Sequence, residues 1–115
     1  MVILTHPISY SQLVHIEEEV IFDDMMKCVA DIDQEIMAVN ADLHSDLEEY
    51  LLSKGSKQES LYGFNILYDD YSIEFDSLIN PPRNRAAGYL RAGRTVADPV
   101  ARHKIEEIVN KWIKK

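Results

Sequence analysis

The chain has 115 residues, of which 46% are hydrophobic and 28% are charged. This length predicts a single domain over residues 1–115, and the hydrophobic content is too high for a disordered protein. The formal net charge of -8 argues against a nucleic-acid footprint over the whole surface, because neutralising phosphates needs clustered lysines and arginines.

No apolar run approaches the roughly 20 residues that a membrane-spanning helix needs. The N-terminal "MVILTHPISY" lacks the basic region and the long apolar segment of a signal peptide. Cys28 is the single cysteine, so no internal disulfide can form. We therefore expect a cytoplasmic protein without a membrane partner.

Charge is distributed unevenly along the chain. Between Glu17 and Glu49 there are twelve acidic residues against Lys27 alone, whereas residues 81–95 contain four arginines and no acid. The sequence therefore predicts a largely acidic protein with one small basic segment.

The first predicted elements are a helix and a β-hairpin. Apolar residues at helical spacing indicate a helix over about residues 11–22. "MMKCVADI" then alternates apolar and polar residues, and "EIMAV" follows after a short polar turn. This pattern is typical of two antiparallel strands.

The segment "ADLHSDLEEYLLSKG" predicts a second helix, because its leucines fall on one helical face. Ser45 and Glu48 fit a capping box, and Asp42 is an alternative cap one turn earlier. Gly55 stands where a helix commonly ends in a left-handed residue.

A second hairpin is predicted for "LYGFNILY" and "YSIEFDSLI", which flank Asp69 and Asp70. Two consecutive prolines at 81 and 82 end its second strand, because proline cannot donate a hydrogen bond to a neighbouring strand.

A long arginine-rich loop then covers residues 81–97, for which the sequence leaves disorder open. Asp98 and Pro99 are typical of a helix start. An apolar stripe follows, made of Ala101, Ile105, Ile108, Val109 and Trp112.

The element order α-β-β-α-β-β-α predicts an α+β fold. The two hairpins would form a mainly antiparallel sheet of about four strands. Three helices covering one face of that sheet would give a two-layer arrangement.

Three stretches carry a resemblance to a known family: "MAVNADLHSDLEEYLLSKGSKQESLYGFNI", "IEFDSLINPPRNR" and "DPVARHKIEEIVNKWI". Over roughly residues 26–113 the chain resembles a small family of uncharacterised prokaryotic proteins, a domain of unknown function. The resemblance implies a compact cytosolic domain and no particular activity. The predicted first helix lies outside the similar part.

The 81–97 loop is the leading candidate for a binding site. Guanidinium groups match carboxylates and phosphates in geometry. The candidates for anion binding are Arg83, Arg85, Arg91 and Arg94, with Tyr89 as a stacking ring. They could bind an anionic ligand or an acidic protein partner, with nucleic acid the less favoured ligand. The alternative is that the arginines only neutralise the acidic surface of the protein itself.

Two further groups of polar residues are weaker candidates. Asp42, His44 and Asp46 are of metal-binding types, but on a helix His44 would point away from the two acids, so helix capping is the favoured interpretation. Lys57 follows a glycine without the spacing of a phosphate-binding loop, which indicates a surface residue.

Glu74 and Asp76 lie on the polar face of a predicted strand, near Asn80. If Arg83 and Arg85 come close, these residues form either a polar pocket or an internal ion-pair network. Surface pairs of this kind contribute only about 0–1 kcal/mol to stability.

The sequence contains no hydrolase, dinucleotide-binding or phosphate-loop signature. We therefore expect a non-enzymatic binding or interaction domain with neither a cofactor nor a metal. One alternative is a small metal-assisted hydrolase or transferase that uses the polar residues of 42–46 or of 74–76. The other is a structural module in which the 11–22 helix packs against its copy in a homodimer.

Overall fold

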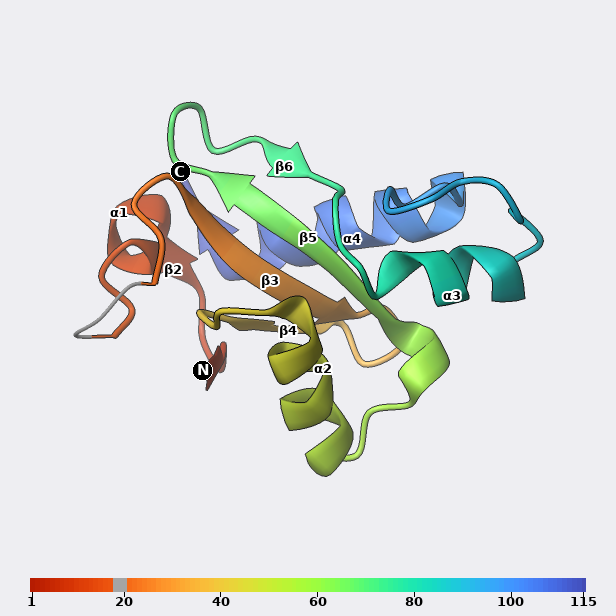
Figure 1. The fold of residues 1–115 in the computed structure, drawn as a ribbon. Coiled ribbons are helices and arrows are strands. Elements are labelled where there is room, and N and C mark those ends of the chain that lie inside the picture. The colour runs from red at the N-terminus through yellow and green to blue at the C-terminus, as the bar shows by residue number, and fades with distance from the viewer. Residues whose placement is uncertain (18–20) are drawn as a thin grey trace.

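The fold is a five-stranded antiparallel sheet with helices packed on both faces (Figure 1). The computed structural model describes residues 1–17 and 21–115. The strands are β1 (Val2–Ile3), β2 (Ile8–Ser9), β3 (Met25–Asp31), β4 (Ile36–Val39), β5 (Leu61–Leu67), β6 (Ile73–Glu74) and β7 (Ile113–Lys114). The helices are α1 (Tyr10–Leu13), α2 (His44–Ser53), α3 (Asn80–Ala86) and α4 (Pro99–Trp112), with a 3₁₀ turn η1 (Gln58–Ser60). The expected α+β class is confirmed.

The strand order in the large sheet is β1-β4-β3-β5-β6, and every neighbouring pair is antiparallel. β3 pairs with β5 along its whole length, from Met25 opposite Leu67 to Asp31 opposite Leu61. The pairs β3–β4 and β5–β6 are the two predicted hairpins, although β6 is only two residues long. A second, parallel pair of β2 with β7 joins the first segment of the chain to the last.

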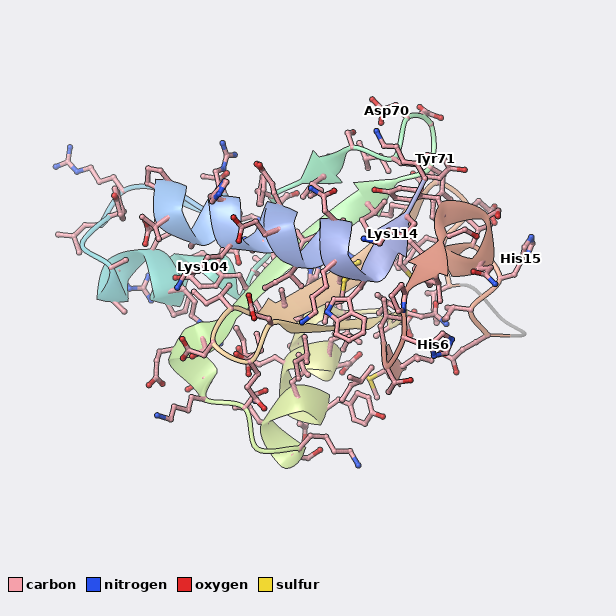
Figure 2. All side chains as sticks on the ribbon, turned by 180° about the vertical axis from the view of Figure 1, so that it is seen from behind. His6, His15, Asp70, Tyr71, Lys104 and Lys114 are labelled. Atoms are coloured by element: carbon pink, nitrogen blue, oxygen red, sulfur yellow. The ribbon has the colours of Figure 1, made fainter. Side chains whose placement is uncertain are left out.

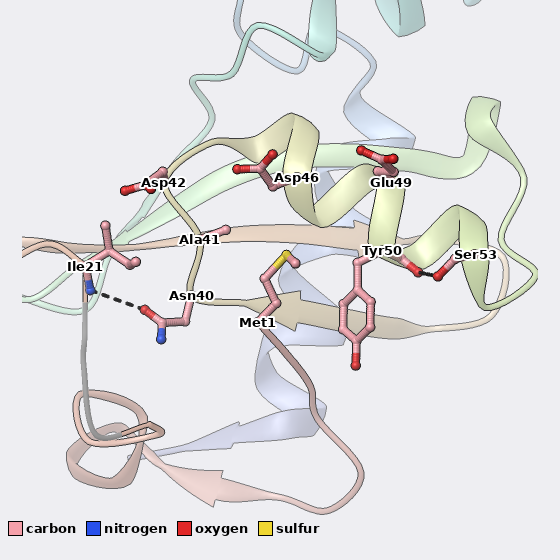
Figure 3. Close-up of a pocket in the computed structure, with 9 residues that line it drawn as sticks. All are labelled: Met1, Ile21, Asn40, Ala41, Asp42, Asp46, Glu49, Tyr50 and Ser53. Carbon is pink, nitrogen blue, oxygen red and sulfur yellow. Dashed lines mark hydrogen bonds between the residues drawn. The ribbon is translucent and has the colours of Figure 1, made fainter.

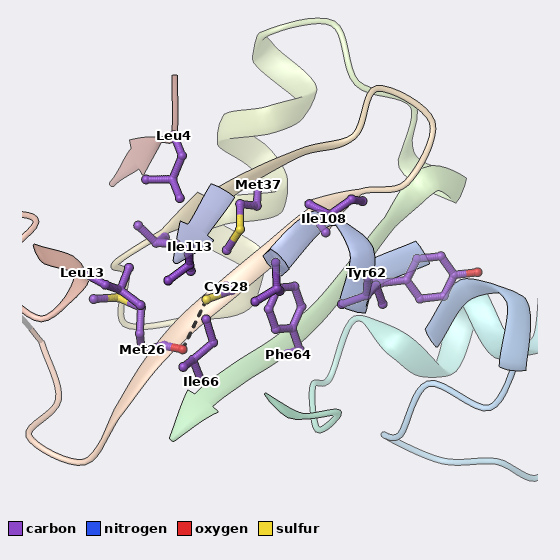
Figure 4. Close-up of a cluster of buried hydrophobic side chains, with 14 of the residues drawn as sticks. Leu4, Leu13, Met26, Cys28, Met37, Tyr62, Phe64, Ile66, Ile108 and Ile113 are labelled. Atoms are coloured by element: carbon purple, nitrogen blue, oxygen red, sulfur yellow. Dashed lines mark hydrogen bonds between the residues drawn. The ribbon is translucent and has the colours of Figure 1, made fainter. Parts of the chain in front are cut away.

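Both faces of the sheet are buried, which corrects the expected two-layer arrangement. On one face Cys28 and Phe64 pack in a cluster with side chains of α4 (Figure 4). On the other face Val29 and Leu61 pack against Leu47 of α2. Figure 2, seen from behind, shows α4 in front of the sheet. Helices cover both sides because the central strands carry apolar residues at odd as well as even positions.

Helix α4 confirms the prediction from its cap and its apolar stripe. The Oδ1 atom of Asp98 accepts a hydrogen bond from the backbone N–H of Val100 at 3.0 Å. The indole N–H of Trp112 donates to the backbone carbonyl of Glu35 at 2.8 Å, which fixes the end of α4 to the β3–β4 turn. None of the helices in the described part of the chain is long and apolar enough to cross a membrane.

Helix α2 is also where the sequence predicted it, and Gly55 after its end has a φ of 101°. The predicted caps are wrong. The helix begins after Leu43 without any side-chain cap, so neither Asp42 nor the pair of Ser45 and Glu48 has that role. Glu48 is free to contact α3 instead, where it forms an ion pair.

The predicted helix over residues 11–22 is wrong beyond its first turn. A capping box of Ser9 and Gln12 starts α1, which ends at Leu13. Ile21, expected on the buried face, has 45% of its surface exposed, so the apolar spacing there does not reflect a buried stripe. Residues 18–20 lie outside the described part of the chain.

The predicted loop over 81–97 begins with a helix. Pro81 and Pro82 lie in the first turn of α3, where the missing N–H costs nothing because first-turn N–H groups have no partner within the helix. The prolines therefore start a helix, whereas we interpreted them as the end of a strand.

Gly63 in β5 marks the closest approach between the sheet and the segment that leads into α3. A β-carbon at this position would lie 2.5 Å from Cβ of Ser77 and closer still to its Oγ. The His44 ring would be 3.2 Å away. Glycine in a strand interior often signals such an approach.

We predict that Gly63→Ala lowers the free energy of unfolding by about 1–3 kcal/mol, because the methyl group overlaps Ser77. Ser77→Gly removes the overlapping atoms. In urea denaturation the double variant should therefore be more stable than the sum of the two single effects implies. Strict additivity of the two substitutions would show that the contact is not tight.

Candidate functional site

Side chains of α3 cover the part of the β5 edge that β6 leaves unpaired. Asn80 is fully buried, and its carboxamide pairs with the backbone of Gly63. The N–H of Gly63 donates to Oδ1 of Asn80, and Nδ2 of Asn80 donates to the carbonyl of Gly63, both at 3.0 Å. Arg83 Nε donates to the carbonyl of Leu61 at 3.1 Å. Two α3 side chains thus replace a strand partner and fix α3 to the sheet.

A second asparagine holds the limb of the loop that returns from α3 to α4. Asn84 lies one turn after Asn80 and is also buried. Its Nδ2 donates to the carbonyls of Gly93 and Thr95, at 2.9 and 2.7 Å, and its Oδ1 accepts from the N–H of Ala97 at 3.1 Å. A segment without regular secondary structure is therefore held at three backbone positions.

The backbone carbonyl of Arg94 completes this anchoring. It accepts hydrogen bonds from Nδ2 of Asn80 at 2.8 Å and from the N–H of Ser77 at 3.1 Å. The base of the loop is consequently ordered by buried, directional bonds.

The loop tip, residues 88–92, projects beyond these anchors. Gly88 and Gly93 flank its exposed part with φ values of 94° and 67°, which glycine adopts without steric cost. Between them Tyr89 and Leu90 are exposed, and Leu90 has 76% of its surface accessible. Large apolar side chains at this exposure suit an interaction surface better than a stable core.

Arg83 does not face solvent, although we predicted it as an anion-binding residue. Its guanidinium is buried and forms an ion pair with Glu48 of α2. Burial lowers the pKa of Arg83 below its ordinary value. Breaking this pair would leave a buried charge without its partner, which is strongly destabilising. The Arg83–Glu48 pair links α3 to α2.

Of the other three arginines in residues 81–97, one forms an ion pair and two form none with any described residue. Arg94 Nε contacts Oδ1 of Asp76 at 2.8 Å, and both side chains are about half exposed, at 54% and 47%. The ion-pair network that the sequence left open for Asp76 thus involves Arg94 and not Arg83 or Arg85. Arg85 and Arg91 are exposed, and neither forms an ion pair with any residue that the structure describes.

The polar-site candidates of the second hairpin lie together along the edge of β5. Nδ2 of Asn65 donates to Oε1 of Glu74 at 3.0 Å, Asp76 pairs with Arg94, and Asn80 binds the strand backbone. Each of these side chains already has a partner inside the protein. The arrangement is an internal polar network along one sheet edge.

The predicted group of Asp42, His44 and Asp46 does not converge. His44 has 6% of its surface exposed, and its Nε2 lies 2.9 Å from the carbonyl of Phe64. Asp42 and Asp46 line a pocket on the outside of α2. Within the described residues, no three His, Cys, Asp or Glu side chains are placed to hold a metal ion.

The acidic pocket beside α2 has a volume of about 490 Å³ (Figure 3). Three carboxylates line it, from Asp42, Asp46 and Glu49. Figure 3 shows the carboxylates in the upper part of the view and the side chains of Met1 and Tyr50 below them. The other lining residues are Ile21, Asn40, Ala41 and Ser53. The pocket thus combines an apolar part with an acidic rim.

Lys57 lies exposed just before η1, beside a cavity of about 150 Å³. The same cavity is lined by Asp31 and Asp33. Asp31 is buried and accepts a hydrogen bond from Ser56 Oγ at 2.7 Å and from the amide of Gln34 at 2.8 Å. These bonds stabilise the β3–β4 turn, so the Asp31 carboxylate that lines the cavity already has partners within the protein.

Cys28 is fully buried in the centre of the sheet, and burial raises the pKa of its thiol far above the ordinary range. Its Sγ donates to the carbonyl of Met26 at 3.4 Å. A thiol in this state is a packing residue and not a nucleophile.

A comparison with known protein families identifies the family of this chain. A family model described as "Protein of unknown function (DUF5674)" matches residues 2–112. The chain belongs to this family. The match begins well before residue 26, so it includes the N-terminal segment that the sequence resemblance left out, and it spans the loop of this DUF5674 protein. No curated protein and no solved structure gave a significant match.

Sequence reasoning missed Asn84, the Glu48 partner of Arg83 and the acidic pocket. One signal was present for the first of these. Asparagine is unfavourable inside helices, because its side chain competes for backbone hydrogen bonds. Two asparagines four residues apart, at 80 and 84, therefore indicate side chains that bind backbone groups elsewhere.

His44 has an unusual protonation equilibrium. Because the Phe64 carbonyl can only accept a hydrogen bond, Nε2 of His44 carries the proton and donates. Burial lowers the pKa of His44 below its ordinary 6.5, Lys27 acts in the same direction, and the bond to Phe64 and the charge of Asp76 oppose the shift. The folded protein therefore keeps this ring neutral to lower pH than the unfolded chain does.

We predict that His44 makes the protein less stable as the pH falls below about 6.5. The His44 side chain then binds a proton in the unfolded chain but stays neutral in the folded protein. The slope from one such group is at most about 1.4 kcal/mol per pH unit. His44→Gln keeps a donor for the Phe64 carbonyl but does not titrate. Urea denaturation between about pH 7.5 and pH 5 should show a shallower loss of stability in this variant, and identical slopes would contradict the prediction.

Proposed function

We propose that this protein is a non-enzymatic interaction domain whose loop tip binds an acidic surface of a protein partner. The observation that supports this most directly is the composition of the exposed tip. Tyr89, Leu90 and Arg91 are consecutive and exposed, and Arg85 is exposed in α3 just before the tip. Arg85 and Arg91 are the two arginines of the segment that have no acidic partner among the described residues.

The chemistry of these side chains fits protein recognition. Arginine and tyrosine are enriched among the residues that contribute most to interface affinity. A guanidinium can bind a carboxylate through two parallel hydrogen bonds. Removing an exposed leucine such as Leu90 from water contributes about 1.5–3 kcal/mol when its burial is complete.

The anchored base favours binding as well. The buried side chains of Asn80 and Asn84 hold the returning limb through partly buried hydrogen bonds. A partner would therefore have to order only the short tip, and the entropic cost of association is correspondingly smaller.

A protein partner is favoured over nucleic acid for two reasons. Binding to a phosphate backbone draws on several cationic groups, whereas the tip region offers only Arg85 and Arg91 on a protein of net charge -8. An exposed leucine also contributes nothing to phosphate contacts.

The test is an amide NMR titration with a synthetic peptide of alternating glutamate and leucine, and with single-stranded RNA in parallel. We expect the peptide to shift resonances of residues 85–92 and the shifts to weaken with added salt. Arg85→Glu combined with Arg91→Glu should abolish them in a protein with an unchanged fold. Lys114→Glu combined with Lys115→Glu changes the net charge equally, just after the end of α4 and away from the tip (Figure 2), and should keep them.

Two outcomes would contradict the proposal. If RNA shifts the same resonances at lower concentration than the peptide, the loop is a nucleic-acid contact. If the peptide shifts no loop resonance even at low salt, the tip does not bind acidic protein surfaces.

A further inference from the structure

The acidic pocket and the loop tip of this chain are opposite in charge and alike in being partly apolar. The pocket has three carboxylates around Tyr50 and the exposed Ile21. The tip has Arg91 next to Tyr89 and Leu90, and Arg85 is exposed near the end of α3, just before the tip. Two surfaces of one molecule thus have the features that would let them bind each other.

The carboxylates of the pocket, from Asp42, Asp46 and Glu49, have no cationic ion-pair partner in the part of the chain that the structure describes. The nearby N-terminal ammonium is bound by Glu17 at 2.8 Å, and the ammonium of Lys54 lies 5.8 Å from the centre of the Tyr50 ring. The pocket therefore presents an excess of negative charge around an apolar part.

A single molecule cannot bring these surfaces together. Figure 1 shows the N-terminus, whose Met1 lines the pocket, on one side of α2, whereas α3 and the loop that follows it lie on the other side. The base of the loop is fixed to α3 by Asn84, so the tip cannot fold back. Another copy of the same chain offers a surface of the required kind.

We propose that the loop tip of one copy docks into the acidic pocket of a second copy, with Leu90 against Tyr50 and Arg91 among the carboxylates. This inference rests on the proposed function and names its partner. Guanidinium–carboxylate contacts beside an apolar anchor are typical of interface centres. The contact is head to tail, because each copy uses a different surface, so it leads to a ring or an open chain of copies.

Charge exchange tests the proposal on the intact protein. One variant reverses the tip, with Arg85→Glu and Arg91→Glu, and another reverses the pocket, with Asp46→Lys and Glu49→Lys. Sedimentation velocity at concentrations reaching about 1 mM should show that the natural protein associates at low salt and separates at high salt. Each variant alone should be monomeric, and an equimolar mixture should associate again, because an unchanged tip meets an unchanged pocket.

Two control variants match the changes in net charge at other surfaces. Lys114→Glu with Lys115→Glu is the control for the tip, and Glu59→Lys with Glu106→Lys is the control for the pocket. Both should associate like the natural protein. Circular dichroism checks that all variants are folded.

Three outcomes would overturn the inference. The natural protein could stay monomeric at low salt. The tip variant or the pocket variant could associate as strongly as the natural protein. The equimolar mixture of the two variants could stay monomeric. If the glutamate–leucine peptide still shifts the loop resonances in those cases, the proposed function stands and the partner is a different acidic protein. If the peptide fails too, the proposed function fails with it.

Discussion

The carboxamide of Asn80 is the contact on which the rest of the structure depends. It occupies the edge of β5 where β6 no longer pairs and satisfies both backbone groups of Gly63. Unpaired N–H and C=O groups on a sheet edge are costly when buried and promote aggregation when exposed. One side chain of α3 avoids both problems. It also requires close packing against the strand, which explains the glycine at position 63 and the proximity of Ser77.

The position of α3 in turn decides what the arginines do. Arg83 extends the same edge contact and binds Glu48 of α2, and Asn84 holds the returning limb of the loop. Two arginines, at 85 and 91, are left exposed near an apolar tip. The charged residues of the segment 81–95 are all arginines. Some of these arginines hold the structure together, and Arg85 and Arg91 are exposed to solvent. The exposed arginines belong to the proposed interaction surface.

Periodicity predicted the elements that dominate the fold. Helices α2 and α4 and the pair of long strands have repeating apolar positions, and those patterns follow directly from backbone geometry. Other features depend on contacts between distant segments. The Asn80 and Asn84 bonds, the Arg83–Glu48 pair and the second buried face of the sheet arise only after the chain has folded. The two prolines were ambiguous, because a strand end and a helix start both tolerate proline.

Amide hydrogen exchange at Ala97 tests the central claim most directly, because this residue lies outside any helix or strand and donates its N–H to Oδ1 of Asn84. We predict that the Ala97 amide is protected in the natural protein. In Asn84→Ala it should exchange at least about tenfold faster, while the amides of β3 are unchanged. An Ala97 amide that exchanges as in an unfolded chain, with the sheet protected, would contradict the account, because the base of the loop would then not be held by α3.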